Sequence, residues 1–546
     1  MEATDIKTAE PKPLKFDKSY LKRTIWIGLA FFGILLVWQL YNGYCSPMLS
    51  FLFAKADYPE IFLNAESQFQ AAVEWAQTAP RDANGLLITS GASADIVKWV
   101  VDGKLLSFDM KSILRVGYLG QEEYLDVQWK VGIIMALDNI AALFIMPIFG
   151  NLSDKTHTKI GKRMPYIIVG SIVTAIAMPF IPFFFNAGMA STGAALVGNL
   201  AGLIAMMVVI IVFMMSYRSP AVALMPDLTP KPLRSKANGI INIVGYVGGL
   251  VGSLGGIFFA VTKYIDGSGK SLLMLEIPFL ICSLVLVASV IALFFKVKEN
   301  KLSEELALDI ERGEAMGESA EQVTTNEKLS KNNIRNLALI LVAEVFWFMS
   351  LNAVETFQTN YYMFWMNTSS AGGMIMTIVS GVGSVVGFLI AGMIADKIGR
   401  KWTIFAGICT VALCYVVYAL IPNQIPADGH LTFEAGLPWA FFILCPIIGF
   451  GSSLIHICSF PLVTDYCTKD KLGRYTSLYY SASMGAQSIT PIVIGLIFQA
   501  TSWIAMPIYS AALMAIAGAV FFFVKAPHNK DTGTNAKGLD ALGADD

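Results

Sequence analysis

Long runs of apolar residues alternate with short polar segments along the whole 546-residue chain. A helix needs about 20 apolar residues to cross the roughly 30 Å hydrocarbon core of a bilayer. Measured against that length, the pattern predicts twelve membrane-spanning helices. The first six cover residues 25–50, 129–150, 165–186, 196–224, 237–261 and 272–296, and the second six cover residues 336–364, 372–395, 402–422, 437–462, 475–500 and 503–524.

The composition also indicates an all-α polytopic membrane protein. Hydrophobic residues make up 55% of the chain and charged residues only 14%, whereas soluble domains carry about 25% charge. The formal net charge of −1 offers no basic excess for nucleic acid. The seven cysteines lie mostly within apolar runs and lack metal-ligand spacing, so we expect no metal and no cofactor. The sequence carries no complete nucleotide or hydrolase motif, which argues against an enzyme.

Basic residues concentrate in the loops after even-numbered spans, so these loops and both termini are expected to be cytoplasmic. The chain is therefore expected to contain two six-span bundles, residues 25–296 and 336–524, joined by a charged cytoplasmic linker at 297–335. Cytoplasmic tails at 1–24 and 525–546 flank the two bundles. Segment 55–126 then lies outside, with eleven acidic and six basic residues and helical stretches near 65–79 and 93–101. It is either a helical cap or a lid or docking site for substrate. The cell (inner) membrane of a bacterium suits these features.

Two loop patterns recur in the two halves of the chain. Asp396 follows Asp154 by 242 residues, and Asp465 follows Asp227 by 238 residues. Two recurrences at nearly one offset predict a duplicated six-span unit, an architecture in which secondary transporters bind substrate between the halves. Glycine at a span end permits close helix packing, and an Asp near a helix end can pair with Arg. We therefore expect a latch that holds the two halves together on the cytoplasmic side. The simpler alternative is that the loop charges only set the orientation of the spans in the membrane. The expected latch residues are Gly150, Asp154, Arg163, Asp227, Arg234, Gly392, Asp396, Arg400, Asp465 and Arg474.

The loops after the second and eighth spans, Gly150-Asn-Leu-Ser-Asp154 and Gly392-Met-Ile-Ala-Asp396 with their following basic pairs, resemble the signature loop of the major facilitator superfamily. More narrowly, Pro147-Ile-Phe-Gly-Asn-Leu-Ser-Asp and Arg218-Ser-Pro-Ala-Val-Ala-Leu-Met-Pro-Asp resemble its sucrose-transporter-like branch, which is related to the glycoside–pentoside–hexuronide cation symporters. The superfamily resemblance covers all twelve spans, and the branch resemblance is concentrated in spans 2–5. Segment 55–126 is a departure, because this connection is usually short.

The resemblance implies two pseudo-symmetric bundles and cation-coupled uptake of a di- or oligosaccharide by alternating access. Melibiose-type symporters carry an Asp on span 4 two residues before a Pro, where this chain has Arg218 before Pro220. Their acidic cation pair on span 2 is also missing from the four residues before Pro147. These departures favour a proton over Na⁺. Sucrose-type carriers are more similar here, since they too place an Arg on span 4.

Ionisable side chains within spans are costly and are retained where they face a cavity or a partner. Asp138 lies near mid-membrane and either couples transport to a proton or pairs permanently with Arg218. His456 follows Arg218 by 238 residues, so it is either the repeat mate that reaches the cavity or a packing residue. Glu344 and Glu355 share a face of span 7, because eleven residues make three turns. One of these two glutamates is expected to accept a proton and the other to bind sugar. The alternative for Glu355 is a solvated carboxylate at the membrane interface. The candidates for cation coupling are Asp138 and Glu344.

Sugar sites combine hydrogen-bonding groups with an aromatic face. The candidates for substrate binding are Gln39, Asn42, Arg218, Glu355, Gln358, His456 and Tyr480. The sequence thus favours a monomeric, proton-coupled symporter that binds a small sugar within the lipid bilayer. The alternatives are a Na⁺-coupled sugar symporter and an exporter of drugs or other small amphiphiles.

Overall fold

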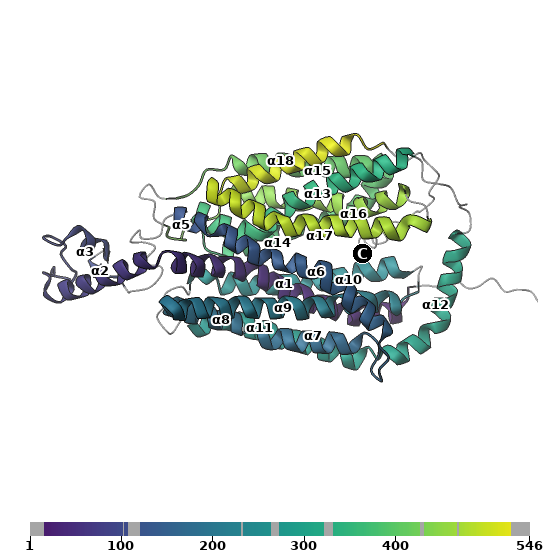
Figure 1. Cartoon of the computed structure of the whole chain (residues 1–546), viewed down its shortest axis with the longest axis horizontal. Helices are drawn as coiled ribbons and strands as arrows, with labels where there is room; N and C mark the ends of the chain where they lie inside the picture. The colour runs from purple at the N-terminus through teal and green to yellow at the C-terminus, as the bar shows by residue number, and fades with distance from the viewer. Residues whose placement is uncertain are drawn as a thin grey trace, which may run out of the picture.

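A computed structural model describes residues 16–101, 103–106, 121–230, 233–263, 272–321, 331–425, 431–466 and 469–525. Twelve helical segments within this part of the chain are long and apolar enough to cross a membrane. They run side by side along the long axis of the molecule (Figure 1). The expected class of fold, an all-α protein with twelve membrane helices, is confirmed.

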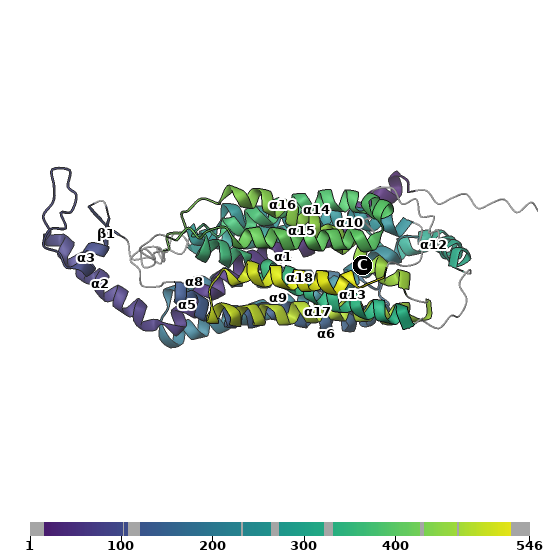
Figure 2. The same cartoon turned by 90° about the horizontal axis from the view of Figure 1, so that it is seen from above.

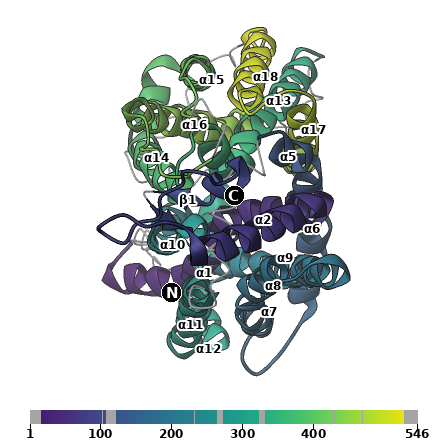
Figure 3. The same ribbon diagram turned by 90° about the vertical axis from the view of Figure 1, so that its left-hand side faces the viewer.

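The helices form two groups, which lie one above the other when the molecule is viewed from its end (Figure 3). The N-terminal bundle comprises α1 (Lys18–Asp57), α6 (Gln128–Lys155), α7 (Met164–Ala177), α8 (Phe180–Ala190), α9 (Gly193–Asp227), α10 (Arg234–Phe258) and α11 (Leu272–Lys296). Of these, α7 and α8 together form one span. The C-terminal bundle comprises α13 (Lys331–Asn360) with its π-helical continuation η3 (Tyr361–Trp365), α14 (Ala371–Ile398), α15 (Arg400–Ala419), α16 (Trp439–Tyr466), α17 (Lys469–Ala500) and α18 (Ala505–Phe522).

Local sequence explains several helix boundaries. The side chain of Asp17 accepts hydrogen bonds from the N–H groups of Ser19 and Tyr20, and so caps the start of α1. Pro179 stands at the junction of α7 and α8, where a proline cannot continue the helical hydrogen-bond ladder. Gly399 separates α14 from α15 with a φ of 84°, a left-handed conformation that glycine adopts without strain.

In both bundles, neighbouring helices approach each other closely at glycine residues. In the N-terminal bundle, α1 packs along α10. A Cβ atom at Gly248 would lie 2.2 Å from the carbonyl oxygen of Phe32, so only glycine permits this separation. Across the two bundles, α6 packs along α17, α10 along α14, and α1 against α13.

Residues 55–126, which we call the insertion, include a described part, residues 59–101, that projects beyond one end of the bundles (Figures 1 and 2). They contain α2 (Pro59–Thr78), α3 (Ala94–Lys98), the antiparallel pair β1 (Val100–Val101) and β2 (Lys104–Leu105), and α5 (Gln121–Asp126). Trp99 is fully buried against Phe69 and forms the centre of this small unit. The helices near 65–79 and 93–101 were expected, but the latter ends at Lys98 and is followed by the hairpin.

The segment between the bundles lies at the opposite end of the molecule (Figure 1). It contains α12 (Glu299–Glu321). A short 3₁₀ turn, η2 (Val261–Lys263), is not part of this segment and follows α10 near the other end of the molecule. Leu306 of α12 packs with Tyr20 and Leu233, and Tyr20 donates a hydrogen bond to Asp309 over 2.9 Å. The linker helix is thereby attached to the N-terminal bundle. We call the two ends of the molecule the insertion end and the linker end.

Candidate functional site

Three ionisable side chains from three spans interact within the membrane region. Asp138 of α6 and Arg218 of α9 belong to the N-terminal bundle, whereas Glu355 of α13 belongs to the C-terminal bundle. Arg218 interacts electrostatically with both carboxyl groups, and the two carboxyl groups interact with each other. Two of the predicted substrate residues and one predicted coupling residue are therefore brought together across the bundle interface. We call Asp138, Arg218 and Glu355 the charged triad.

Exposure differs among the members of the triad. The Asp138 side chain is 5% exposed, and its carboxylate accepts hydrogen bonds from the backbone and side-chain N–H groups of Asn139. Arg218 is half-buried, whereas Glu355 is exposed and accepts a hydrogen bond from Trp38 of α1. A carboxyl of the C-terminal bundle that interacts with groups of the N-terminal bundle faces the space between the bundles.

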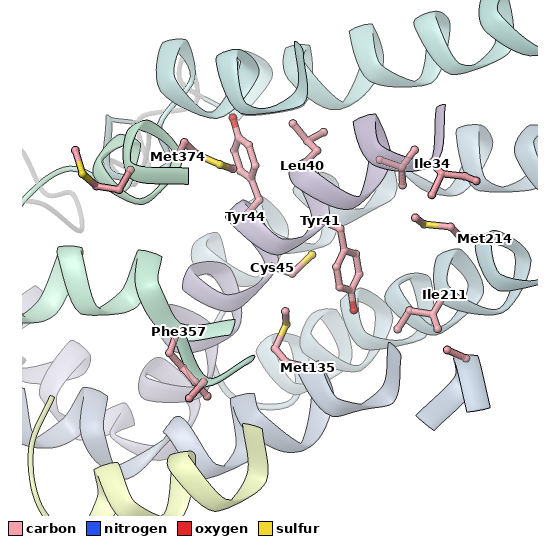
Figure 4. Close-up of a cluster of buried hydrophobic side chains, with 14 of the residues drawn as sticks. Ile34, Leu40, Tyr41, Tyr44, Cys45, Met135, Ile211, Met214, Phe357 and Met374 are labelled. Atoms are coloured by element: carbon pink, nitrogen blue, oxygen red, sulfur yellow. The ribbon is translucent and has the colours of Figure 1, made fainter. Parts of the chain in front are cut away.

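Aromatic and sulfur-containing side chains surround the triad on the side of α1. Trp38 stacks on Tyr41 with ring centroids 6.0 Å apart. Figure 4 shows Tyr41, Cys45 and Met135 close to one another where α1 and α6 approach. The Tyr41 hydroxyl is buried, has no hydrogen-bond partner among the described residues, and interacts electrostatically with Asp138. One wall of the site is therefore apolar and aromatic.

The remaining predicted substrate residues lie at different distances from this centre. Asn42 is half-buried and follows Trp38 by one helical turn, so it lies on the same face of α1. Gln39 contacts the glycine-rich face of α10, because Cβ atoms built at Gly249 and Gly252 would lie 3.3 and 3.1 Å from its side chain. It therefore lies at the α1–α10 contact.

Gln358, His456 and Tyr480 make their described contacts within the C-terminal bundle. Gln358 donates a hydrogen bond to Thr377 of α14 over 2.6 Å. The ring of His456 packs against Phe348 at a tilt of 58°, with centroids 5.4 Å apart, and the ring of Tyr480 packs near Phe460. These three side chains are thus placed by C-terminal neighbours rather than by the triad.

Glu344 occupies a different environment from Glu355, although both lie on α13. Its side chain is fully buried, and neither carboxylate oxygen has a hydrogen-bond partner among the described residues. An ionised carboxylate in such a place would be very costly, so the apolar surroundings require a neutral group or a counter-ion. The shared helical face was predicted, but the sequence pattern did not distinguish the accessible glutamate from the enclosed one.

At the insertion end, buried amides and hydroxyls join the two bundles. The side-chain amide of Asn360, the last residue of α13, lies 3.0 Å from each of three acceptors, the hydroxyls of Ser46 and Ser50 on α1 and the Gln128 carbonyl oxygen on α6. All four side chains are essentially inaccessible to water. We call this group the Asn360 cluster. Each hydrogen bond that Asn360 makes here crosses the bundle interface.

Close backbone packing completes the closure at the insertion end. A Cβ atom at Gly132 of α6 would lie 2.1 Å from the carbonyl oxygen of Pro491 on α17. A Cβ atom at Gly495 of α17 would lie 2.6 Å from the carbonyl oxygen of Gln128. Thr262 and Ser369 also share a hydrogen bond of 2.9 Å across the bundles. The two bundles are therefore in tight contact on this side.

A cavity of about 410 Å³ lies on the linker side of the triad. It is lined by residues of three N-terminal helices: Met146 of α6, Ser219, Val222, Ala223, Met225 and Pro226 of α9, and Arg234 and Asn238 of α10. Ser219, which lines the cavity, is next to Arg218 in the chain. The structure is closed at the insertion end and contains a largely apolar cavity on the N-terminal bundle toward the linker end.

The predicted latch residues of the N-terminal bundle form one network. The Arg163 side chain is buried, donates to Asp227 over 2.9 Å, and also binds Asp154 and Ser153. Lys162 forms a second ion pair with Asp227 at 3.0 Å. Gly150 lies against Ser219, where a Cβ atom would be 2.9 Å from the hydroxyl oxygen. These bonds lie within the N-terminal bundle in this conformation.

Arg234 caps the end of α9, since its guanidinium donates to the carbonyl oxygens of Thr229 and Pro226. In the C-terminal bundle, Arg400 at the start of α15 donates to the carbonyl oxygen of Pro461 over 3.4 Å. Gly392 is half-buried in α14, Asp396 is exposed at the end of that helix, and Arg474 is exposed on α17. The side chain of Asp465 lies outside the described residues.

Sequence reasoning missed an acidic residue in the linker helix. The Glu299 carboxylate accepts hydrogen bonds from the N–H groups of Lys162, Arg163 and Met164 at 3.0–3.1 Å, and so caps the start of α7. A Cβ atom at Gly161 would lie 2.0 Å from this carboxylate. Glu299 follows a basic span end and precedes many other acids, so its sequence position gave no distinguishing signal. Across the described ranges, no three His, Cys, Asp or Glu side chains gather to hold a metal ion.

The fold and the site together define a polytopic helical membrane protein with a charged centre between two bundles. The family model of the Major Facilitator Superfamily matches residues 118–427 and 366–542. The chain therefore belongs to the Major Facilitator Superfamily, as the loop motifs predicted. Members of this family are membrane transporters, so the protein is a transporter and not an enzyme.

Two characterised relatives are similar in sequence. The lactose permease of Lactobacillus helveticus is 25% identical over 307 residues, which cover 54% of this chain and 44% of the permease. Sucrose transport protein SUC4 of Arabidopsis thaliana is 21% identical over 379 residues, which cover 62% of this chain and 71% of that protein. The chain thus matches less than half of the length of the permease.

Solved structures share the fold. The nucleoside transporter NupG is 10% identical, with a TM-score of 0.51 over 92% of this chain and 99% of that chain. A bacterial homologue of the lysosomal transporter Spinster is 13% identical, with a TM-score of 0.52 over 94% of this chain and 97% of that chain. At these identities the likeness establishes the architecture alone.

Proposed function

We propose that the protein is a proton-coupled symporter that takes up a di- or oligosaccharide by alternating access. The observation that carries this proposal is the charged triad, in which two carboxyl groups and one guanidinium meet between the bundles. Two relatives are named for lactose and sucrose, which supports a sugar as substrate. The proposal needs no cofactor.

Charge balance supplies the coupling. Arg218 remains charged at any relevant pH and compensates one carboxylate. When both Asp138 and Glu355 are ionised, the site carries a net charge of −1 in a low-dielectric region, which resists closure of the bundles around it. Binding of one cation at the second carboxyl neutralises the site. A proton meets this need, because Asp138 is almost completely buried and burial disfavours a charged carboxylate.

The sugar-binding roles follow from chemistry. The face of Trp38 suits the apolar side of a pyranose ring, and the guanidinium of Arg218 and the carboxylate of Glu355 suit its hydroxyl groups. Asn42 lies one turn away on the same face of α1. In this scheme Gln39, Gln358, His456 and Tyr480 shape the periphery of the site. Glu344 is a second protonation site that does not contact the sugar.

The latch residues of the two halves control opening at the linker end. Arg163 and Asp227 hold the loop between α6 and α7 against α9, and Arg400 holds α15 against α16. We assign the linker end and both termini to the cytoplasm of a cell with an inner membrane, on the basis of loop charge. The protein acts as a monomer, because both bundles needed for the site belong to one chain.

A panel of sugars in proteoliposomes tests this function. Purified protein is reconstituted, and accumulation of labelled lactose, sucrose and a nucleoside is followed under a proton gradient and, separately, under a Na⁺ gradient. We expect a disaccharide to accumulate under the proton gradient alone. Accumulation driven only by Na⁺ would replace the proton in the mechanism, and outward movement of amphiphiles without sugar uptake would establish an exporter.

A further inference from the structure

The last helix of the insertion is not part of the projecting unit, because it packs into the closure at the insertion end. Tyr124 of α5 is fully buried and stacks on Phe364 of η3 with ring centroids 4.2 Å apart and an interplanar angle of 22°. Its ring also meets Phe51 of α1 edge-on at 5.7 Å. Phe364 in turn stacks on Trp503 at 5.3 Å. An aromatic side chain of the insertion thus lies between the two bundles.

Asp126, at the end of α5, connects the same three parts of the molecule by hydrogen bonds. One carboxylate oxygen accepts from Gln499 of α17 over 2.7 Å. The other accepts from Tyr58, which directly follows α1, over 2.9 Å. Burial, this hydrogen bond and the nearby acids raise the pKa of Tyr58 to about 12, so its hydroxyl keeps the proton that it donates. Asp126 is therefore bonded both to the base of the insertion and to the C-terminal bundle.

A third contact braces this base on the N-terminal bundle. Lys130 of α6 forms an ion pair with Asp57, the last residue of α1, at 2.5 Å. The start and the end of the insertion are thus tied to each other and to α6. The contacts of Tyr124 with Phe364 and of Asp126 with Gln499, by contrast, reach across to the opposite bundle.

We propose that α5 is a lid of the outer gate, which closes the substrate path at the insertion end by stacking Tyr124 on Phe364 and binding Gln499 through Asp126. When the bundles separate at this end, α5 stays with the N-terminal bundle and leaves α13 and α17. The lid acts together with the Asn360 cluster, which lies beneath it on the helices. The insertion is thereby a working part of the transport cycle, and this holds whichever substrate the protein carries.

Cysteine labelling tests the lid without a transport assay. A cysteine introduced by Asn42→Cys lies on the site-facing side of α1 and reacts with a membrane-impermeant maleimide only when the outer gate opens. The reagent is applied from the insertion side. We expect Asp126→Ala and Gln499→Ala each to raise the labelling rate about tenfold. Each substitution removes the hydrogen bond from Gln499 to the Asp126 carboxylate, and this bond exists only when the gate is closed.

Asp95→Ala serves as the matched control, since it removes an exposed Asp–Lys pair at 3.2 Å within the projecting unit and should leave the rate unchanged. Gln499→Ala alters an exposed side chain and keeps the test valid if Asp126→Ala fails to fold. Equal labelling rates in wild type, Asp126→Ala and Gln499→Ala would overturn the proposal.

A cross-link provides the converse test. Cysteines at positions 126 and 499, joined by a short bifunctional thiosulfonate, should prevent labelling at position 42 and stop transport until a reductant is added. The same reagent on proteins that carry only one of the two introduced cysteines is the control. A cross-linked protein that is still labelled from the insertion side would show that α5 does not close the path. Loss of labelling in a protein that transports no sugar would support the lid while rejecting the proposed substrate.

Discussion

Removal of the Asn360 amide should shift the balance between the closed and open states at the insertion end. The amide has two N–H groups for its three acceptors at 3.0 Å, so at most two strong hydrogen bonds form at once. Each contributes about 1 kcal/mol net. Asn360→Ala therefore weakens closure by about 2 kcal/mol, which corresponds to roughly a 30-fold change in the equilibrium between the two states.

Distance measurements between spin labels provide the assay. Labels at exposed positions on the insertion-end termini of α6 and α17 report whether the bundles are in contact. In Asn360→Ala the population with separated ends should rise, and the protein should remain folded because its other core contacts persist. Ser350→Ala is the matched control, because it removes a buried hydrogen bond of 2.7 Å to Ser510 inside one bundle. Identical distance distributions in wild type and Asn360→Ala would refute the reasoning.

Three further predictions concern other parts of the molecule. Gly132→Leu should reduce transport to background and leave the gate open at the insertion end, since the new side chain overlaps the Pro491 carbonyl; normal turnover would contradict this. Arg163→Ala should lower the free energy of unfolding by about 1–3 kcal/mol, because it leaves Asp227 with one basic partner. The melting temperature in detergent should fall accordingly, and an unchanged melting temperature would disprove this prediction. Trp38→Phe keeps the aromatic face but loses the N–H donor to Glu355, so sugar uptake should fall less than in Trp38→Ala; equal losses would reject the stacking role.

The fold was readable from the sequence because each membrane helix carries a strong local signal. The charged triad was partly readable for the same reason, since a charge within an apolar span is rare and stands out. The loop motif after the second span also recurs after the eighth, and it precedes α7 and α15, with Arg163 directly before α7 and Arg400 at the start of α15. These features depend on neighbours in the chain or on a fixed repeat distance.

Other parts of the site depend on contacts between distant segments. Ser46, Ser50, Gln128 and Asn360 are neutral, common residue types, and only tertiary packing makes them a buried cluster. The helical periodicity placed Glu344 and Glu355 on one face, but it contains no information on which one faces the space between the bundles. Glu299 becomes important only because α12 docks on the N-terminal bundle.

The central claim is that a protonatable carboxyl in the charged triad couples sugar to proton movement. The most direct measurement is the sugar-induced pH change outside proteoliposomes, recorded for wild type and Asp138→Asn with a disaccharide that the wild type accumulates. We predict that the disaccharide alkalinises the external medium for wild type. In Asp138→Asn this proton movement should disappear while exchange of labelled for unlabelled sugar persists. Undiminished sugar-driven proton uptake in Asp138→Asn would contradict the account.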